Sequence, residues 1–199
     1  DIRIEGQDAP QEQDEVYPEN SFAEIAQFCR WRYISLSEYV ELNEGPGIWD
    51  FLAEVWQTMK QAIADGLAAE GTLPGGLNVE RKAKRLYAQS KENERPQVRE
   101  LRIVCAYAFA VSEQNADNGT IVTAPTCGSA GVMPALVYAL RHEMFIGDRA
   151  IREAFLASAA VGFIAKHNAS IAGAEVGCQG EIGVASAMAA AFVADARGY

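Results

Sequence analysis

Residues 148–196 read DRAIREAFLASAAVGFIAKHNASIAGAEVGCQGEIGVASAMAAAFVADA. The two ends of this stretch, 148–166 and 182–196, are rich in Ala, Ser and Gly. Small side chains let helices approach closely, so we expect two long helices that cross in the middle of the core. The segment between them, 167–181, is rich in glycine and contains Cys178. Glycine on the N-terminal side of this cysteine indicates a backbone with positive φ or a close approach to another group.

The rest of the chain also has helical signals. Ser21 and Ser35 each stand three residues before a glutamate, which is the capping-box pattern of a helix start. Apolar residues recur at helical spacing, and turn residues separate the periodic segments. We expect further helices over 49–66, 79–88, 96–112 and 134–142. Because strands and helices do not alternate, the sequence predicts an all-α fold, a multi-helix globular domain with Gly/Pro-rich active-site loops.

The composition limits the number of domains and the kinds of partner. The sequence has 199 residues, 49% of them hydrophobic, and a formal charge of −10. Residues 1–19 are acidic and contain two prolines, so we expect a flexible arm or linker followed by one helical domain over 20–199. An acidic chain repels phosphate backbones, which argues against nucleic acid. We expect neither a signal peptide nor a membrane-spanning run, and hence a cytoplasmic protein.

The cysteines divide into two pairs. Cys29 and Cys105 lie on apolar helical stripes, where a small buried side chain is expected. Cys127 and Cys178 lie in glycine-flanked loops, where a thiol is available as a metal ligand or a nucleophile. A Schiff base between Lys166 and pyridoxal phosphate is not expected, because no glycine-rich phosphate loop of the usual kind accompanies it.

Three segments together resemble a known family. Residues 166–181 resemble the hallmark sequence of the iron–sulfur L-serine dehydratases. The turn 73–77, followed by Arg81-Lys82-Ala83, is similar to that family's second motif, and the loop 123–134 is similar to its third. The resemblance extends from about Ser21 to the end of the sequence.

The resemblance implies a fold and a chemistry. In that family an all-helical α chain or α domain holds a [4Fe–4S] cluster on three cysteines. The open iron acts as a Lewis acid on the hydroxyl of L-serine. A base removes the α-proton, hydroxide leaves, and the enamine hydrolyses to pyruvate and ammonia. The family's role is amino-acid catabolism that feeds gluconeogenesis.

The resemblance also implies roles for individual residues. Its first cluster cysteine falls on Cys178, while its other two lie further on, in C-D-P and P-C-x-x-R-N motifs that this sequence does not contain. We therefore expect a C-terminally incomplete α domain that neither holds a stable cluster nor turns over serine alone. Groups expected to support catalysis are Lys166, Asn168, Ser170 and Glu175. Groups expected to hold the substrate carboxylate are Thr126, Gly128 and Ser129.

Several alternatives stay open at this stage. Asn168 and Ser170 can instead cap helices. The chain can be a cysteine-nucleophile enzyme that uses Cys127, or a non-catalytic helical binding module. The expected partners are L-serine, a β domain or β subunit, and further copies of the chain. The general base, and the preference for serine over threonine, are not predicted.

Overall fold

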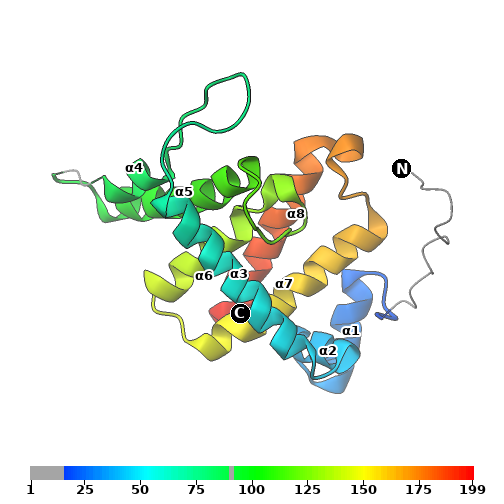
Figure 1. Cartoon of the computed structure of the whole chain (residues 1–199). Coiled ribbons are helices and arrows are strands. Elements are labelled where there is room, and N and C mark those ends of the chain that lie inside the picture. The colour runs from blue at the N-terminus through cyan, green and yellow to red at the C-terminus, as the bar shows by residue number, and fades with distance from the viewer. Residues whose placement is uncertain (1–15, 90–91) are drawn as a thin grey trace, which may run out of the picture.

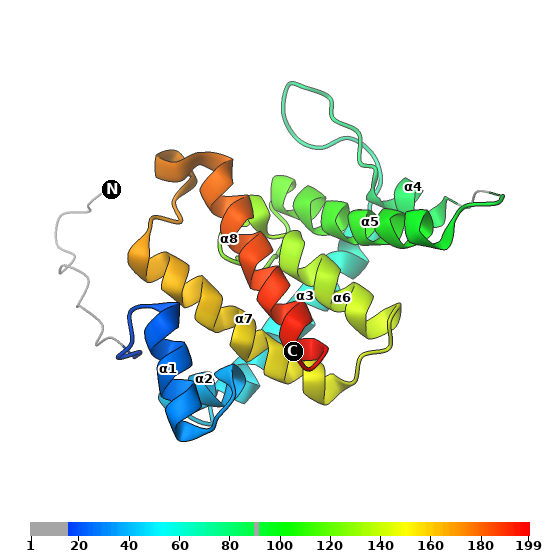
Figure 2. The same cartoon turned by 180° about the vertical axis from the view of Figure 1, so that it is seen from behind.

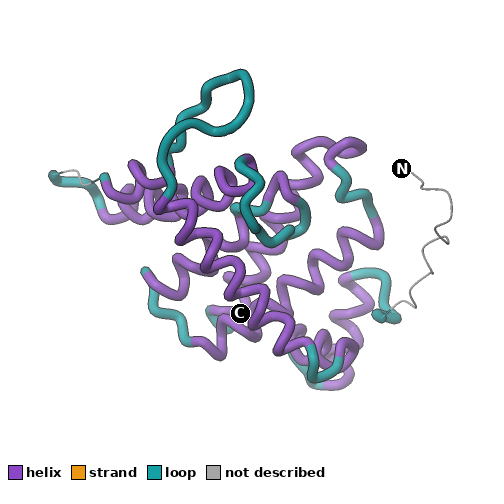
Figure 3. The backbone as a smooth tube through the Cα atoms, in the orientation of Figure 1, coloured by secondary structure: helices purple, strands orange, loops and turns teal. Residues whose placement is uncertain are grey.

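The computed structural model describes residues 16–89 and 92–199, and this part of the chain is helical (Figures 1 and 3). The α-helices are α1 Phe22–Arg32, α2 Leu36–Glu44, α3 Ile48–Ala68, α4 Ala83–Ala88, α5 Pro96–Ala116, α6 Val132–His142, α7 Asp148–Asn168 and α8 Gly173–Ala196. A short 3₁₀ helix, η1, covers Cys127–Ser129. The prediction of an all-α fold is confirmed for the described residues.

Helices α7 and α8 lie side by side in both cartoon views (Figures 1 and 2) and form the most extensive helix–helix contact of the molecule. Alanines of α7 at 154 and 160, and of α8 at 189 and 196, belong to the main core, so their small side chains let the helices come close. The expected pairing of these two helices is thereby confirmed. A second core cluster joins α3, α5 and α6 around Ile63.

Ser21 and Ser35 are the N-cap residues of α1 and α2, as the local sequence predicts. The Ser21 hydroxyl accepts from the backbone N–H of Glu24, and the Ser35 hydroxyl accepts from that of Glu38. The Glu38 carboxylate accepts in return from the Ser35 backbone N–H at 2.7 Å, which completes a capping box. These hydrogen bonds also hold the pKa of the Glu38 carboxyl below its ordinary value.

Several predicted elements differ from the structure, among them α8, which begins at Gly173 instead of at 182. Helix α4 begins at Ala83 and not at 79 as predicted, because Asn78 has a φ of +51° and turns the chain just before the expected start. Residues 72–80 form a loop that projects from the body, closed by a hydrogen bond from Leu73 N–H to Val79 C=O (Figure 1). Helix α6 starts at 132, two residues earlier than expected.

A further difference concerns α5, whose buried face is not the predicted one. Leu101 lies on the same apolar stripe as Cys105, for which burial was expected, yet 65% of Leu101 is exposed. The buried face instead contains Ile103, Tyr107 and Val111, which pack on α3 and α6. Apolar residues occur on both sides of this helix, so spacing alone did not identify the buried side.

Part of the acidic arm predicted over 1–19 lies outside the described residues, which begin at 16. Tyr17 is buried, and its hydroxyl donates to Glu44 at 2.7 Å. The hydroxyl of Tyr39 donates to Glu19 at 2.6 Å. Residues 17 and 19 thus pack on α2.

Helix α8 has an unusual surface. Among the described residues it is the one helix whose length and apolar composition would allow it to cross a membrane, contrary to the expectation that no run is long enough. Core helices of soluble proteins meet the same criteria of length and composition. Only 11% of its most apolar window is buried within the described structure, so much of this apolar helix faces outward.

Candidate functional site

The site begins where α8 is interrupted. Gly177 has φ +64° and ψ −169°, so it breaks the helix between the turn 173–176 and the long segment that follows. Such a φ is readily available only to glycine, which confirms the prediction of positive φ beside the cysteine. Cys178 is exposed and starts the long segment of α8, so it lies in a helix and not in the loop that the sequence predicted.

The C-terminal end of α5 binds two loops, the one that ends at 82 and the loop 123–129. Glu113 is buried and accepts from the backbone N–H groups of Lys82 and Ala83, at 2.7 and 3.3 Å. Arg81 forms an ion pair with Asp117. These hydrogen bonds and this ion pair attach the end of the loop 72–82 to the C-terminal end of α5.

The same end of α5 holds the loop 123–129. The side-chain amide of Asn115 donates to the backbone carbonyl of Cys127 at 3.1 Å. A methyl group on Gly131 would lie 2.5 Å from the Ala108 carbonyl oxygen, so this glycine lets the loop end pack directly on α5. The second and third motifs noted in the sequence therefore both attach to the end of α5.

The loop 123–129 reaches α8 through Glu181. The Thr126 hydroxyl donates to Glu181 Oε1 at 2.7 Å, across 55 residues of sequence. A methyl group on Gly128 would lie 2.7 and 2.8 Å from the two Glu181 oxygens, and one on Gly173 would lie 3.0 Å from its carboxyl carbon. The Glu181 carboxylate is therefore held between two glycines, one turn after Cys178.

The residues predicted to hold a substrate carboxylate lie together in this loop. Thr126 is half-buried and bound to Glu181. Gly128 is exposed, with its Cα beside the same carboxylate. The hydroxyl of Ser129 is buried and lies 3.4 Å from the Thr126 carbonyl oxygen, to which it donates, so it holds the loop in shape.

The four residues predicted to support catalysis do not converge at one point. Asn168 donates to the carbonyl oxygens of Asn20 and Ile164, at 2.7 and 3.0 Å. The Ser170 hydroxyl accepts from the Ala172 backbone N–H at 3.1 Å. The bond from Asn168 to Ile164 satisfies a carbonyl at the end of α7, as the capping alternative expects, whereas the bond to Asn20 joins α7 to a distant part of the chain. Ser170 does not cap α8, whose N-cap residue is Ala172. Glu175 is exposed on the turn that precedes Gly177.

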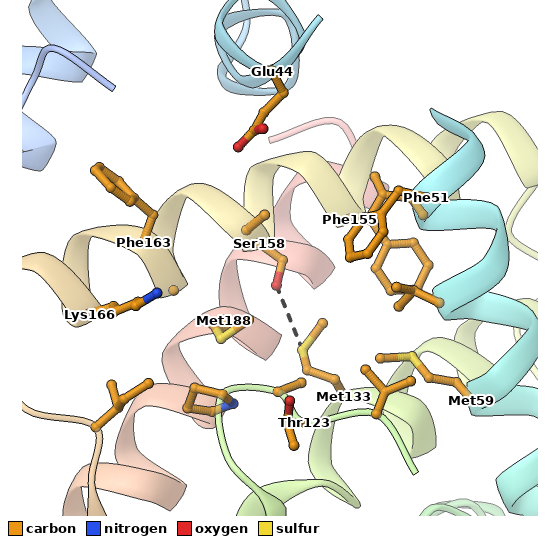
Figure 4. A pocket seen from close by; sticks show the side chains of 18 of the residues that line it. Glu44, Phe51, Met59, Thr123, Met133, Phe155, Ser158, Phe163, Lys166 and Met188 are labelled. Atoms are coloured by element: carbon orange, nitrogen blue, oxygen red, sulfur yellow. Dashed lines mark hydrogen bonds between the residues drawn. The ribbon is translucent and has the colours of Figure 1, made fainter. Parts of the chain in front are cut away.

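Lys166 borders a cavity of about 450 Å³ between α3, α7, α8 and residues 122–125. Its ammonium group points toward the cavity (Figure 4). The walls are mainly apolar side chains such as Phe155, Met133 and Met188, and the Ser158 hydroxyl inside donates to Met133 Sδ at 3.7 Å. These apolar walls do not resemble a pocket for a small polar molecule. The hydrogen-bonded polar side chains of this region instead lie at Thr126, Ser129 and Glu181.

A metal centre requires several ligand side chains that lie close together. Within 16–89 and 92–199, no three His, Cys, Asp or Glu side chains are close enough together to hold a metal ion. Cys127 and Cys178 are both exposed thiols. His142 stacks on Tyr138, with ring centroids 4.1 Å apart, and His167 lies 5.9 Å from Phe163. The described residues therefore do not fit a complete iron–sulfur cluster and offer at most part of its ligands.

Glu181 is the residue that sequence reasoning placed in the site region without giving it a role. Its partner Thr126 is distant in sequence, so no spacing pattern connects the two. The one sequence feature that pointed to this contact was Gly128, because a glycine can indicate that another group approaches the backbone closely.

We predict a measurable coupling between Thr126 and Glu181. A hydrogen bond to a charged acceptor that is partly exposed should contribute about 1 kcal/mol to the free energy of unfolding. Urea unfolding of Thr126→Val, Glu181→Ala and the double variant would give this interaction energy. The pair Thr126→Val and Glu175→Ala is the control and should be additive to within about 0.5 kcal/mol. Additivity of the first pair would contradict the hydrogen bond.

The family comparison and the similar relatives described below all point to serine dehydratases. The family described as serine dehydratase alpha chain matches residues 25–199. The chain is 40% identical to L-serine dehydratase 1 of Escherichia coli over 97% of its length, and 40% identical to L-serine dehydratase TdcG of the same organism over 92%. It is 37% identical to an L-serine dehydratase of Streptomyces coelicolor over 92%. The chain spans 44, 42 and 41% of the lengths of these three relatives.

Proposed function

The chain belongs to the serine dehydratase alpha chain family, and from this premise we propose that it acts as part of an enzyme that deaminates L-serine to pyruvate and ammonia. The main support is its identity of 37–40%, over 92–97% of its length, to proteins named L-serine dehydratase. These relatives are more than twice as long, so we propose that further polypeptide completes the active enzyme.

We propose that the loop 123–129 binds the α-carboxylate of L-serine. Thr126, Gly128 and Ser129 lie in one loop that α5 holds in place through Asn115. The backbone of such a loop, placed ahead of α6, offers N–H groups to an anion. A carboxylate held there would lie beside Glu181 and face the start of the long segment of α8.

We propose that the enzyme uses a [4Fe–4S] cluster and that Cys178 provides one of its ligands. The thiol is exposed at a fixed backbone break, where an incoming group can reach it. Because the described residues do not fit a complete cluster, the other ligands must come from polypeptide outside them. We also propose a cytoplasmic location, since four cysteines in 199 residues is far below the density of a disulfide scaffold.

A second candidate, a cysteine-nucleophile enzyme, has less support. Cys127 is exposed, as a nucleophile must be. The relatives that the chain matches are named L-serine dehydratases, which favours the first candidate.

The proposed function predicts a substrate profile. The holoenzyme, with every polypeptide that it contains, should form pyruvate from L-serine after anaerobic reconstitution with iron and sulfide. D-Serine should not react, because reversal at Cα moves the α-proton away from the base. L-Threonine should react more slowly, by about 10- to 200-fold, since one methyl group changes binding by 1–3 kcal/mol. Absence of pyruvate from L-serine in a reconstituted sample would overturn the proposed function.

A further inference from the structure

Helix α8 is covered on one side only. On its inner side Ala185, Ala189 and Phe192 are buried, and the ring of Phe192 lies edge-on to that of Phe155 of α7, with centroids 5.1 Å apart. The opposite side, called the outer face below, is exposed and contains Ile182, Ser186, Ala187 and Ala190. In Figure 2 α8 runs across the front of the molecule, and no other described segment crosses in front of it.

The composition of the outer face is unusual for a surface in water. The run 182–194 contains no Asp, Glu, Lys or Arg. A surface helix of a soluble protein normally carries charged and polar side chains on the side away from the core. Here Ile182 is 43% exposed, and alanines stand where charges would be expected. An exposed apolar surface of this kind indicates an interaction site.

The shape of the outer face fits a second helix. Ile182, Ser186 and Ala190 follow one another at steps of four residues, which forms a ridge along the helix surface. Ser186, Ala187 and Ala190 have small side chains, so the surface beside the ridge is shallow. Helices with small side chains at their contact pack with axes about 8 Å apart, at the close end of the usual range.

The proposed enzyme contains polypeptide that can supply this helix. The chain spans 41–44% of the lengths of the three relatives, so more than half of each relative has no counterpart in it. The outer face also begins next to the proposed metal ligand, because Ile182 lies four residues after Cys178, on the neighbouring turn of α8. A helix that covers the outer face would therefore reach the thiol, where the described residues do not complete a cluster.

We propose that the outer face of α8 is the docking surface for an apolar helix of the further polypeptide that completes the enzyme. This inference rests on the proposed function and adds to it the place where that polypeptide binds. Docking removes the uncharged face from water and brings the new segment beside Cys178. The side chains that the incoming helix turns toward α8 must be uncharged, since no group of the outer face can pair a charge.

A membrane is a less suitable partner for α8. A helix needs about 20 predominantly apolar residues to cross a bilayer. The uncharged run 182–194 has 13 residues, with Glu181 before it and Asp195 after it. In addition, Glu181 is half-buried and accepts a hydrogen bond from Thr126, so the start of the run is attached to the loop 123–129.

The test measures whether the outer face is covered in the holoenzyme, with Ala187→Cys as the probe and Ala64→Cys as its control. Ala64 is exposed on α3, beside the hydrogen-bonded pair Gln61 and Asp65, and so represents a polar helix surface. Reaction with a water-soluble maleimide, located by mass spectrometry, should be at least tenfold slower at 187 than at 64. A smaller difference would overturn the proposal.

Two further conditions identify what covers the outer face. Dilution of the holoenzyme until each particle holds one copy of this chain should leave the protection at 187 unchanged. Loss of protection on dilution would assign the face to a second copy of the chain. Protection that requires vesicles of phosphatidylglycerol would assign it to a membrane. Either of these results would overturn the proposal.

The variant Ala187→Arg, with Ala64→Arg as its control, gives an independent check. A covered outer face offers no partner for the new charge, so the Tm of the holoenzyme should fall by more than about 5 °C, whereas the control should stay within about 1 °C of the wild type. Equal Tm values for the two variants would overturn the proposal. Neither measurement depends on turnover. A protected outer face in a holoenzyme that leaves L-serine unchanged would support the docking surface and overturn the proposed function alone.

Discussion

Replacement of Cys178 by alanine is expected to remove both the iron–sulfur chromophore and pyruvate formation from the reconstituted holoenzyme. The thiol is exposed at the start of the long segment of α8, directly after the break at Gly177. Alanine fits a helix start without strain, so the fold should be retained while a metal ligand is lost. Even the partners that orient metal ligands contribute 10–100-fold to activity, so loss of a ligand should cost more than about 100-fold.

The control for this experiment is Cys29→Ala. Cys29 is half-buried on α1 and packs against the main core. Burial raises the pKa of its thiol, and the carboxylates of Glu19 and Glu38 raise it further, so it is a poor ligand and nucleophile. Iron content and rate should therefore be normal in Cys29→Ala. If Cys178→Ala binds iron and forms pyruvate as the wild type does, the cluster assignment is wrong.

The largest expected effect on stability is that of Gly66→Ala. Gly66 is buried on α3 where it crosses α5, and a methyl group there would lie 2.2 Å from the backbone oxygen of Ala110. A backbone atom in the middle of a helix cannot move aside as the end of a side chain can. Overpacking costs about 1–3 kcal/mol and sometimes more, so we expect a loss of about 3 kcal/mol in the free energy of unfolding.

Gly183→Ala is the matched control for that substitution. Gly183 lies inside α8, and a methyl group there has open space within 4 Å. Alanine is favoured over glycine within helices, so this variant should gain about 0.5–1 kcal/mol. Guanidinium chloride unfolding of both variants gives the comparison. Equal midpoints for Gly66→Ala and the wild type would show that α3 and α5 do not approach as closely as described.

Local features of the fold were predictable from the sequence, because their causes lie within a few residues. The capping box at Ser35 and the positive φ of Gly177 are examples. The pairing of α7 with α8 was also predictable, since small residues occur along both helices. The start of α4 was not, because Asn78 adopts a left-handed conformation that no periodic pattern indicates.

The candidate site was predictable only in part. The family resemblance drew attention to Cys178 and to the loop around Thr126, but several groups were chosen by their place in a motif. Asn168 and Ser170 bind nearby backbone groups, and Lys166 borders an apolar cavity. Glu181 acquires its significance from a contact with Thr126 that only the folded chain creates. Long-range pairs of this kind are determined by helix packing, which sequence spacing does not record.

The most direct test of the central claim is to measure pyruvate formation from L-serine against bound iron in the same samples of holoenzyme. Samples reconstituted to different extents should show a rate proportional to their cluster content, and the rate should fall to background after chelation under air. A rate that is unchanged when the iron has been removed would contradict an iron–sulfur L-serine dehydratase.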